Sequence, residues 1–398
     1  MQMDLSKRYQ QWDAGRSFFA SCLQPLLDVL AMYFLIEVFR AGETEKTVLA
    51  VVVRSGMLLG IPLSALLARL KMPINRGLWL IYGLAAVCVF LLPFVQAAFV
   101  YISLFCLVSL ARDGTNSLLS DVYAGYPKEV RTGRYSTSVV ALIAGGLCFS
   151  GLVNLLLSRE PGQHRLLFPV LALPLLLAAL CSVKLPRRIF SEHQGLGLKE
   201  LAGILKKDKL FMYILISWFL MGSANLWLIT YRTNMLVEPQ FGFTYGPERV
   251  VLLLVIVPEA VRLLCIPVYV RLVDRVNFIV LRIILNIFFC LYIGCFFIGG
   301  QLIFHLLGVV FFGLAYGGGA IIWRLWINKY APPGQSAAYM ALHAGFTGIR
   351  SILTPIFGLF ALNRIGPVVC ALISLGLLTA SILMLLFIIP TGRSRFNH

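Results

Sequence analysis

Long apolar stretches alternate with short polar breaks along nearly the whole chain. Lipid has no partner for an open strand edge, and the period-two alternation of barrel strands is absent, so the stretches predict helices. A bilayer core of ~30 Å is crossed by ~20 apolar residues in a helix. The twelve expected spans are residues 17–39, 47–69, 77–96, 98–121, 136–157, 166–183, 210–236, 249–272, 277–298, 301–327, 335–361 and 366–389.

Composition agrees with this pattern. The chain is 59% hydrophobic and only 13% charged, whereas soluble domains are usually ~25% charged. We therefore expect an all-α membrane protein with about twelve transmembrane helices. The nine cysteines fall in apolar spans without a metal-type CxxC pair, and no P-loop or nucleophile elbow is present. These features predict no cofactor, no metal, no catalytic residue and no enzyme activity.

Lysine and arginine set the expected orientation. The N-terminal tail, the loops after even-numbered spans and the C-terminal tail carry 22 of these residues, and the opposite side carries 6. Basic loops stay in the cytoplasm, so both termini should be cytoplasmic and the protein should lie in the cell (inner) membrane. The net charge of +17 is then explained by the basic cytoplasmic loops. It does not indicate nucleic-acid binding, since no basic-aromatic module is present.

A basic stretch at residues 184–209 divides the chain. It predicts an N-terminal six-helix bundle over 1–183, a cytoplasmic linker loop over 184–209 and a C-terminal six-helix bundle over 210–398. At an offset of about 205 residues, Pro62 of span two meets Pro267 of span eight. Internal repeats of this kind are typical of transporters that hold their site between two bundles.

On these features the chain resembles the major facilitator superfamily (MFS). The basic turn at 127–134 looks like the family's linker after span four, and Asp274 and Arg275 match the acid-arginine pair of its signature loop. In the first half, the corresponding segment at 64–69 lacks the family's Gly and Asp. The resemblance implies two pseudo-symmetric bundles, alternating access, and spans one, four, seven and ten around the cavity. Gating is expected at Asp121, Asp274 and Arg275.

Charged side chains inside the spans are costly to bury and usually face the bundle interior. They fall mainly in the spans that the resemblance places around or beside the cavity; Arg282, near the inner end of span nine, is assigned to the cytoplasmic side. We expect substrate binding by Arg112, Asn225, Arg262, His343 and Arg350. Asp28, Asp113 and Glu259 are the expected proton-coupling residues.

Two alternatives remain open for the acids. Asp28 lies mid-span with no opposite charge within one turn of its helix, so it can carry a proton or pair with an arginine across the bundle. Glu259 and Arg262 are three residues apart and can neutralise each other.

The charge inventory leads to a function. Midplane arginines slightly outnumber acids, and arginine suits carboxylate and phosphate. We therefore expect a secondary active transporter that moves a small organic anion by alternating access, coupled to protons, and acts as a monomer in the lipid bilayer. One alternative is a proton-driven exporter of amphipathic or cationic drugs. The other is a transport-dead receptor or assembly partner.

The charge bias predicts which positions face the cytoplasm. In a cysteine-free background, single cysteines replacing Ser158 and Ser191 should react with a membrane-impermeant thiol reagent from opposite sides of the membrane. Only the cysteine at 158 should react in intact cells. Reaction of the cysteine at 191 from outside would invert the orientation.

Overall fold

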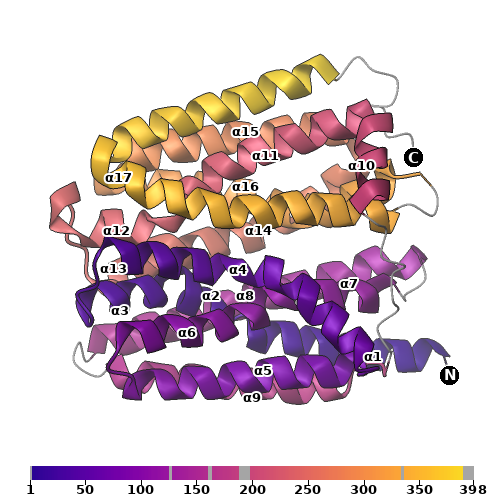
Figure 1. The fold of residues 1–398 in the computed structure, drawn as a ribbon, viewed down its shortest axis with the longest axis horizontal. Coiled ribbons are helices and arrows are strands. Elements are labelled where there is room, and N and C mark those ends of the chain that lie inside the picture. Colours follow the sequence, from indigo (N-terminus) through magenta and orange to yellow (C-terminus); the bar gives the residue numbers. More distant parts are fainter. Residues whose placement is uncertain (1, 125–127, 160–163, 188–197, 333–335, 389–398) are drawn as a thin grey trace. The chain divides into compact units, whose positions relative to one another are not determined.

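The structure of the protein is a computed structural model, which describes residues 2–124, 128–159, 164–187, 198–332 and 336–388 (Figure 1). These residues are almost entirely helical and contain no strand. The fold class expected from the apolar pattern is thereby confirmed, and the described residues of each expected span lie in helical segments.

The first half contains six spans. Span one is broken into short pieces, span four is interrupted by a π turn, and the others are single helices or nearly so. The elements are α1 (Gln2–Ala20), α2 (Leu23–Pro25), η1 (Leu26–Leu30), α3 (Ala31–Glu37), α4 (Glu43–Arg69), α5 (Ile74–Leu91), η2 (Leu92–Phe94), α6 (Ala98–Ser109), η3 (Leu110–Gly114), α7 (Asn116–Ala124), α8 (Lys128–Arg159) and α9 (His164–Val183).

The second half begins with the short helix α10 (Leu198–Lys207), at the amphipathic end of the basic stretch. Its other elements are α11 (Lys209–Thr230), α12 (Arg232–Val237), η4 (Pro239–Phe241), α13 (Pro247–Val251), η5 (Leu252–Ile256), α14 (Val257–Arg275), α15 (Phe278–Ile293), η6 (Gly294–Ile298), α16 (Leu302–Tyr330) and α17 (Ser336–Ile388). The last two spans form α17 and are separated at Gly366, whose φ of 77° lies in the region open to glycine.

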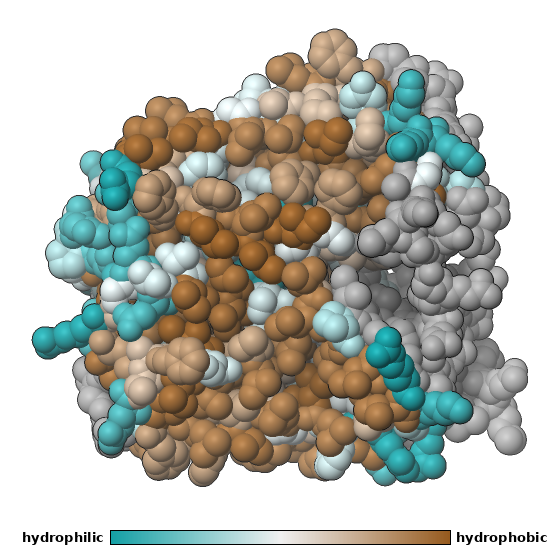
Figure 2. Space-filling view, viewed as in Figure 1, coloured by the Kyte–Doolittle hydropathy of each residue, from teal (hydrophilic) through white to brown (hydrophobic). Residues whose placement is uncertain are grey.

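The outer surface is apolar. Leu264, Phe357 and Phe387 are among many large hydrophobic side chains that are more than half exposed, and hydrophobic residues cover most of the face in Figure 2. Among the described residues, nine helical stretches are long and apolar enough to cross a membrane, and one of them, Leu342–Ile388, covers the last two spans. Such a surface is stable only in contact with lipid, which makes this a multi-pass membrane protein.

Contacts divide the chain into two compact units. The first unit comprises residues 1–192 with 233–259, and the second comprises 193–232 with 260–398. Segment 233–259 includes α13 and η5, which pack against α8 within the first unit. The three sequence domains proposed above, with a linker at 184–209, stay a prediction.

Within the first unit, two glycines let α4 lie against the π turn η3. A Cβ added at Gly56 would collide with the carbonyl oxygen of Ser109, and one added at Gly60 would lie 2.8 Å from the carbonyl oxygen of Gly114. Small residues permit such close backbone approach between membrane helices. This crossing brings the polar residues of α4 and η3 together.

The crossing predicts different effects of the same glycine-to-alanine substitution at two sites. Gly56→Ala should lower the thermal unfolding temperature, because overpacking costs roughly 1–3 kcal/mol. Gly83→Ala on α5 is the control, because no atom lies within 4 Å of its added Cβ; it should leave stability unchanged or raise it by up to ~1 kcal/mol through helix propensity. Equal melting of Gly56→Ala and wild type in detergent would show that the close approach is not required.

Candidate functional site

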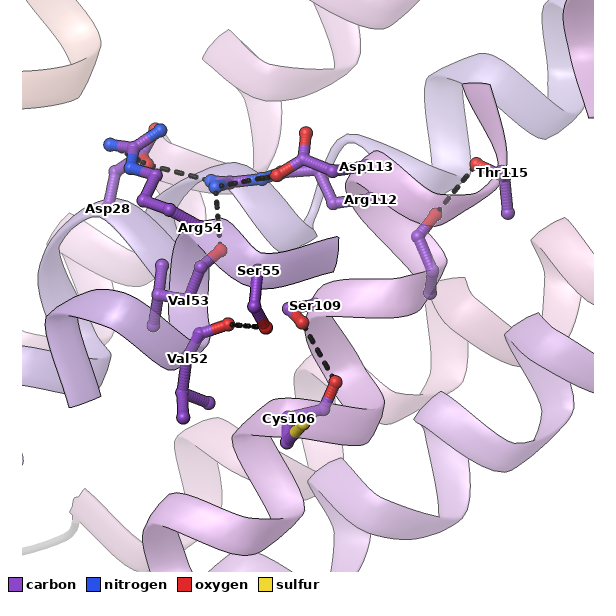
Figure 3. A network of polar contacts seen from close by, with 11 residues as sticks. Asp28, Val52, Val53, Arg54, Ser55, Cys106, Ser109, Arg112, Asp113 and Thr115 are labelled. Carbon is purple, nitrogen blue, oxygen red and sulfur yellow. Dashed lines mark hydrogen bonds and ion pairs between the residues drawn. The ribbon is translucent and has the colours of Figure 1, made fainter. Parts of the chain in front are cut away.

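A charged network lies inside the first unit (Figure 3). Asp28 of η1 accepts a hydrogen bond from Arg112 Nη1 at 2.7 Å and another from Arg54 Nη2 at 3.3 Å. Arg112 Nη2 also lies 3.3 Å from Asp113 Oδ2. The structure therefore brings together Asp28, Arg112 and Asp113, three of the residues chosen from the sequence, and adds Arg54. Two arginines face two acids, so the network is balanced in charge.

The backbone at this network departs from the α-helix. Asp28 lies in the π turn η1, and Arg112 and Asp113 lie in the π turn η3. π turns inside α-helices are rare and occur frequently at functional sites. Arg112 and Asp113 are neighbours in one such turn, and both belong to the charged network around Asp28.

Asp28 therefore has arginine partners on other helices, although none lies within one turn on its own. Its side chain is 19% exposed, and the side chains of both arginines are 17% exposed. Two guanidinium donors favour the carboxylate form of an acid. Protonation of Asp28 would have to break these ion pairs; its role in proton coupling stays a prediction.

Glu259 is buried in the first unit at the beginning of α14, with 2% of its surface exposed. Gln24 Nε2 donates a hydrogen bond to its Oε1 at 2.5 Å. Gly146 of α8 leaves room for this pair, since an added Cβ there would lie 2.8 Å from Gln24 Oε1. A neutral amide thus contacts this acid, whereas guanidinium groups contact Asp28.

A cluster of basic and aromatic side chains occupies the second unit. Arg282, His343 and Arg350 are 2%, 1% and 7% exposed. The Arg282 guanidinium carbon lies 3.5 Å from the centre of the Trp218 ring, and the His343 ring packs 4.9 Å from the same ring. Arg350 Nη1 donates to the carbonyl oxygen of Trp218. The helices α11, α15 and α17 supply these four residues, which we call the cationic cluster.

The cationic cluster retains unused donors. Arg282 Nη2 and Arg350 Nε are buried donors, and they have no hydrogen-bond partner among the residues that the structure describes; the same holds for the buried ring nitrogen Nε2 of His343. The three basic groups are also close enough to interact electrostatically with one another. Acids are scarce here: from residue 260 to the end of the chain the sequence has one, Asp274. Buried polar groups are nearly always satisfied, so this cluster is suited to a ligand that accepts hydrogen bonds.

Gly222 of α11 leaves room for the Arg350 side chain. A Cβ added at Gly222 would occupy the place of the Arg350 guanidinium group. The side chain can cross α11 and reach the Trp218 carbonyl only because residue 222 has no side chain.

The remaining predicted binding residues lie in the second unit. Arg262 is buried, and its guanidinium carbon lies 5.1 Å from the centre of the Tyr316 ring. Tyr316 also interacts electrostatically with Arg350. Tyr316 therefore lies near two of the predicted binding residues, Arg262 and Arg350. Asn225 is buried, with its Nδ2 3.0 Å from the sulfur of Met221.

Three residues were expected to form gates: Asp121, Asp274 and Arg275. Arg275 is exposed at the end of α14. The side chains of Asp121 and Asp274 lie outside the described part of the chain, so their roles stay predictions.

Two acid sites were missed from the sequence. Asp13 is buried in α1 and accepts hydrogen bonds from Arg16, from Tyr123 at 2.6 Å and from Ser138 at 2.5 Å. The expected start of span one at residue 17 left Arg16 in the cytoplasmic N-terminal tail, but Arg16 is buried inside the first unit, because helix α1 begins well before that position.

The second acid site repeats this arrangement in the other unit. Asp208 precedes α11 and accepts hydrogen bonds from Tyr330 and Tyr339, both at 3.0 Å. In each half, an acid shortly before the first expected span thus accepts hydrogen bonds from hydroxyl groups on the helices of the fourth and fifth spans. The signal in the sequence was weak, since Asp13 and Asp208 are 195 residues apart and do not follow the offset of about 205.

Comparison with solved structures identifies the fold. The chain matches a mutant of the nucleoside transporter NupG with a TM-score of 0.74 and 15% identity over 94% of this chain and 99% of that one. It matches a D-xylose-proton symporter with a TM-score of 0.68 and 15% identity over 97% and 98%. The human organic anion transporter MFSD10 (TETRAN) gives a TM-score of 0.65 and 12% identity over 95% and 99%.

The chain has the MFS fold. This confirms the fold expected from the resemblance, over nearly the full length of both chains in each comparison. No family model matches the sequence, and no curated protein matches it. At these identities the likeness concerns the fold alone, so the choice of solute has to be argued from the residues.

Proposed function

We propose that the protein is a proton-coupled secondary active transporter of a small organic anion, working by alternating access. It acts as a monomer in the cell (inner) membrane with both termini in the cytoplasm. The observation that carries the anion assignment is the cationic cluster, in which two arginines and a histidine are buried beside one another with unused donors.

Burial explains why this cluster favours an anion. A guanidinium group taken from water into a low-dielectric interior loses several kcal/mol of solvation, which a counter-charge has to offset. The first unit supplies counter-charges from Asp28 and Asp113, but among the described residues the two arginines of the cationic cluster contact a carbonyl oxygen and aromatic rings. A carboxylate or phosphate oxygen satisfies both the charge and the donors.

The structural neighbours are consistent with this proposal but do not select the solute. They are transporters of nucleosides, of xylose with protons and of organic anions. One fold therefore carries solutes of different charge. The buried residues of this chain favour the anion.

Proton coupling is proposed through Asp28. While Asp28 is ionised, it neutralises part of the charge of Arg54 and Arg112. When it takes up a proton, the network of Asp28, Arg54, Arg112 and Asp113 loses one negative charge and becomes net positive. Proton uptake and anion binding then favour each other, as linkage requires for two coupled sites.

The anion proposal predicts an unusual effect on stability. Arg282→Gln should raise the melting temperature of the ligand-free protein, because it removes repulsion among buried positive groups. The same substitution, and Arg350→Gln, should weaken anion binding roughly 10–100-fold, the value of one charge-assisted hydrogen bond. Arg350→Lys should weaken it nearly as much, because the planar fork is lost.

The measurement is thermal shift of the purified protein against organic carboxylates, phosphates, amphipathic cations and neutral solutes. Arg364→Gln is the matched control, since Arg364 is exposed on the same helix as Arg350; it should bind anions like wild type. Stabilisation by cations alone would favour the drug-exporter alternative. Unchanged anion affinity in Arg282→Gln and Arg350→Gln would make the cluster structural.

The coupling proposal predicts separable activities. Asp28→Asn should abolish accumulation driven by a pH gradient while exchange of labelled for unlabelled solute survives, because exchange needs no deprotonation. Anion binding should tighten as pH falls in wild type and lose that dependence in Asp28→Asn. Both activities are to be measured in proteoliposomes, with Glu259→Gln as the comparison.

Loss of both activities in folded Asp28→Asn protein would identify Asp28 as a fixed partner of Arg54 and Arg112. If the pH dependence of anion binding is lost in Glu259→Gln but kept in Asp28→Asn, the proton-carrying residue is Glu259 and not Asp28. Glu259 accepts a hydrogen bond from the Gln24 amide.

A further inference from the structure

A hollow lies on the outside of the first unit, where α5 begins and α9 ends. It has a volume of about 280 Å³ and is lined by Met72, Arg76, Trp79, Leu80 and Val183. Trp79, Leu80 and Val183 are all more than two-fifths exposed. The hollow thus combines one cation, one indole ring and an apolar wall, and none of these residues belongs to the charged network or the cationic cluster.

A hydrogen bond joins the two helices at this place. Asn75 Nδ2 donates to the carbonyl oxygen of Val183 at 3.1 Å. Asn75 itself is buried. Because this bond holds the end of α9 against the beginning of α5, the basic residues that follow Val183 are brought near those that precede Asn75.

Five exposed cations come from these two chain segments: Arg69, Lys71, Arg76, Lys184 and Arg187. Residues 69–91 and 164–187 contain no acid. Lys71 has a φ of 50° in the turn between α4 and α5, a left-handed conformation that few side chains adopt. The turn therefore places a lysine next to Met72 at the edge of the hollow. The site is strongly positive and has no acid from its own segments.

Below the cations, the same two helices present an apolar surface. Leu84 and Val87 of α5 and Leu176 and Leu180 of α9 are exposed, as lipid-facing side chains are in a membrane helix. Tryptophan is enriched where headgroups meet acyl chains, and the arginine side chain extends toward headgroups. Charge at one end and exposed leucine and valine below it match the two ends of a phospholipid.

We propose that this hollow binds an anionic phospholipid of the leaflet on the basic side of the membrane. Arg76 contacts the phosphate, Trp79 lies at the level of the glycerol, and an acyl chain follows the exposed apolar residues of α5 and α9. The flanking Lys71 and Lys184 favour a headgroup with net negative charge over a zwitterionic one, because basic pockets between membrane helices on this side select anionic headgroups. The proposal is independent of the solute transported.

The test uses the full-length purified protein with phosphatidylglycerol, phosphatidylcholine of the same acyl chains, and inorganic phosphate. Native mass spectrometry measures the lipid bound, and thermal shift measures the stabilisation. Wild type should bind phosphatidylglycerol at least about tenfold more tightly than phosphatidylcholine and should be unaffected by inorganic phosphate. Arg76→Gln should reduce the preference for phosphatidylglycerol over phosphatidylcholine about fivefold. Adding Lys71→Gln or Lys184→Gln to this variant should reduce the preference further.

Arg364→Gln is the control for the loss of one exposed charge and should keep the full preference. Arg76 is exposed, so Arg76→Gln should melt like wild type without lipid, which separates lipid binding from folding. An unchanged preference in the folded Arg76→Gln protein would overturn the proposal. Competition by inorganic phosphate would overturn it as well, by identifying a site for free anions.

Discussion

Each buried guanidinium group in this protein needs a partner inside a body that is solvated by lipid rather than water. The first unit provides such partners from its own chain: Asp13 pairs with Arg16, and Asp28 pairs with Arg54 and Arg112. The second unit does not follow this rule at Arg282 and Arg350, which contact an indole ring and a backbone carbonyl. The two units thus meet the same electrostatic constraint in different ways. The charged network of the first unit is neutralised by its own acids, whereas the cationic cluster of the second unit is suited to an external anion.

Much of the fold could be predicted from the sequence because lipid imposes a simple rule. Each span is a run of apolar residues, and the breaks between runs are polar, so the twelve segments were correctly placed to within a few residues in most cases. Span one was the clearest exception at its N-terminal end. Asp13 and Arg16 looked like a polar tail, but they neutralise each other, and α1 extends through them into the interior.

The candidate sites were predicted only in part. Asp28, Arg112 and Asp113 could be chosen because a charge in the middle of an apolar run is conspicuous. Arg282 could not, since it lies near the end of its span, where an arginine usually extends to the headgroups. What decides its position is the ring of Trp218, 64 residues earlier in the chain. Tertiary pairing of this kind leaves no periodic signal, and the same holds for the hydroxyl groups that bind Asp13 and Asp208.

The π turns at η1 and η3 have a consequence for how this chain can change over evolutionary time. A π turn accommodates one residue more than the α-helical turn that it replaces. Deleting one residue from η1 would convert this wide turn into an α-helical turn, and the flanking helical segments would keep their orientation while the side chains within the turn change direction. Asp28 would then leave Arg54 and Arg112, although every apolar span would remain intact. The register of the charged network is therefore sensitive to single-residue insertions and deletions that hydropathy alone would tolerate.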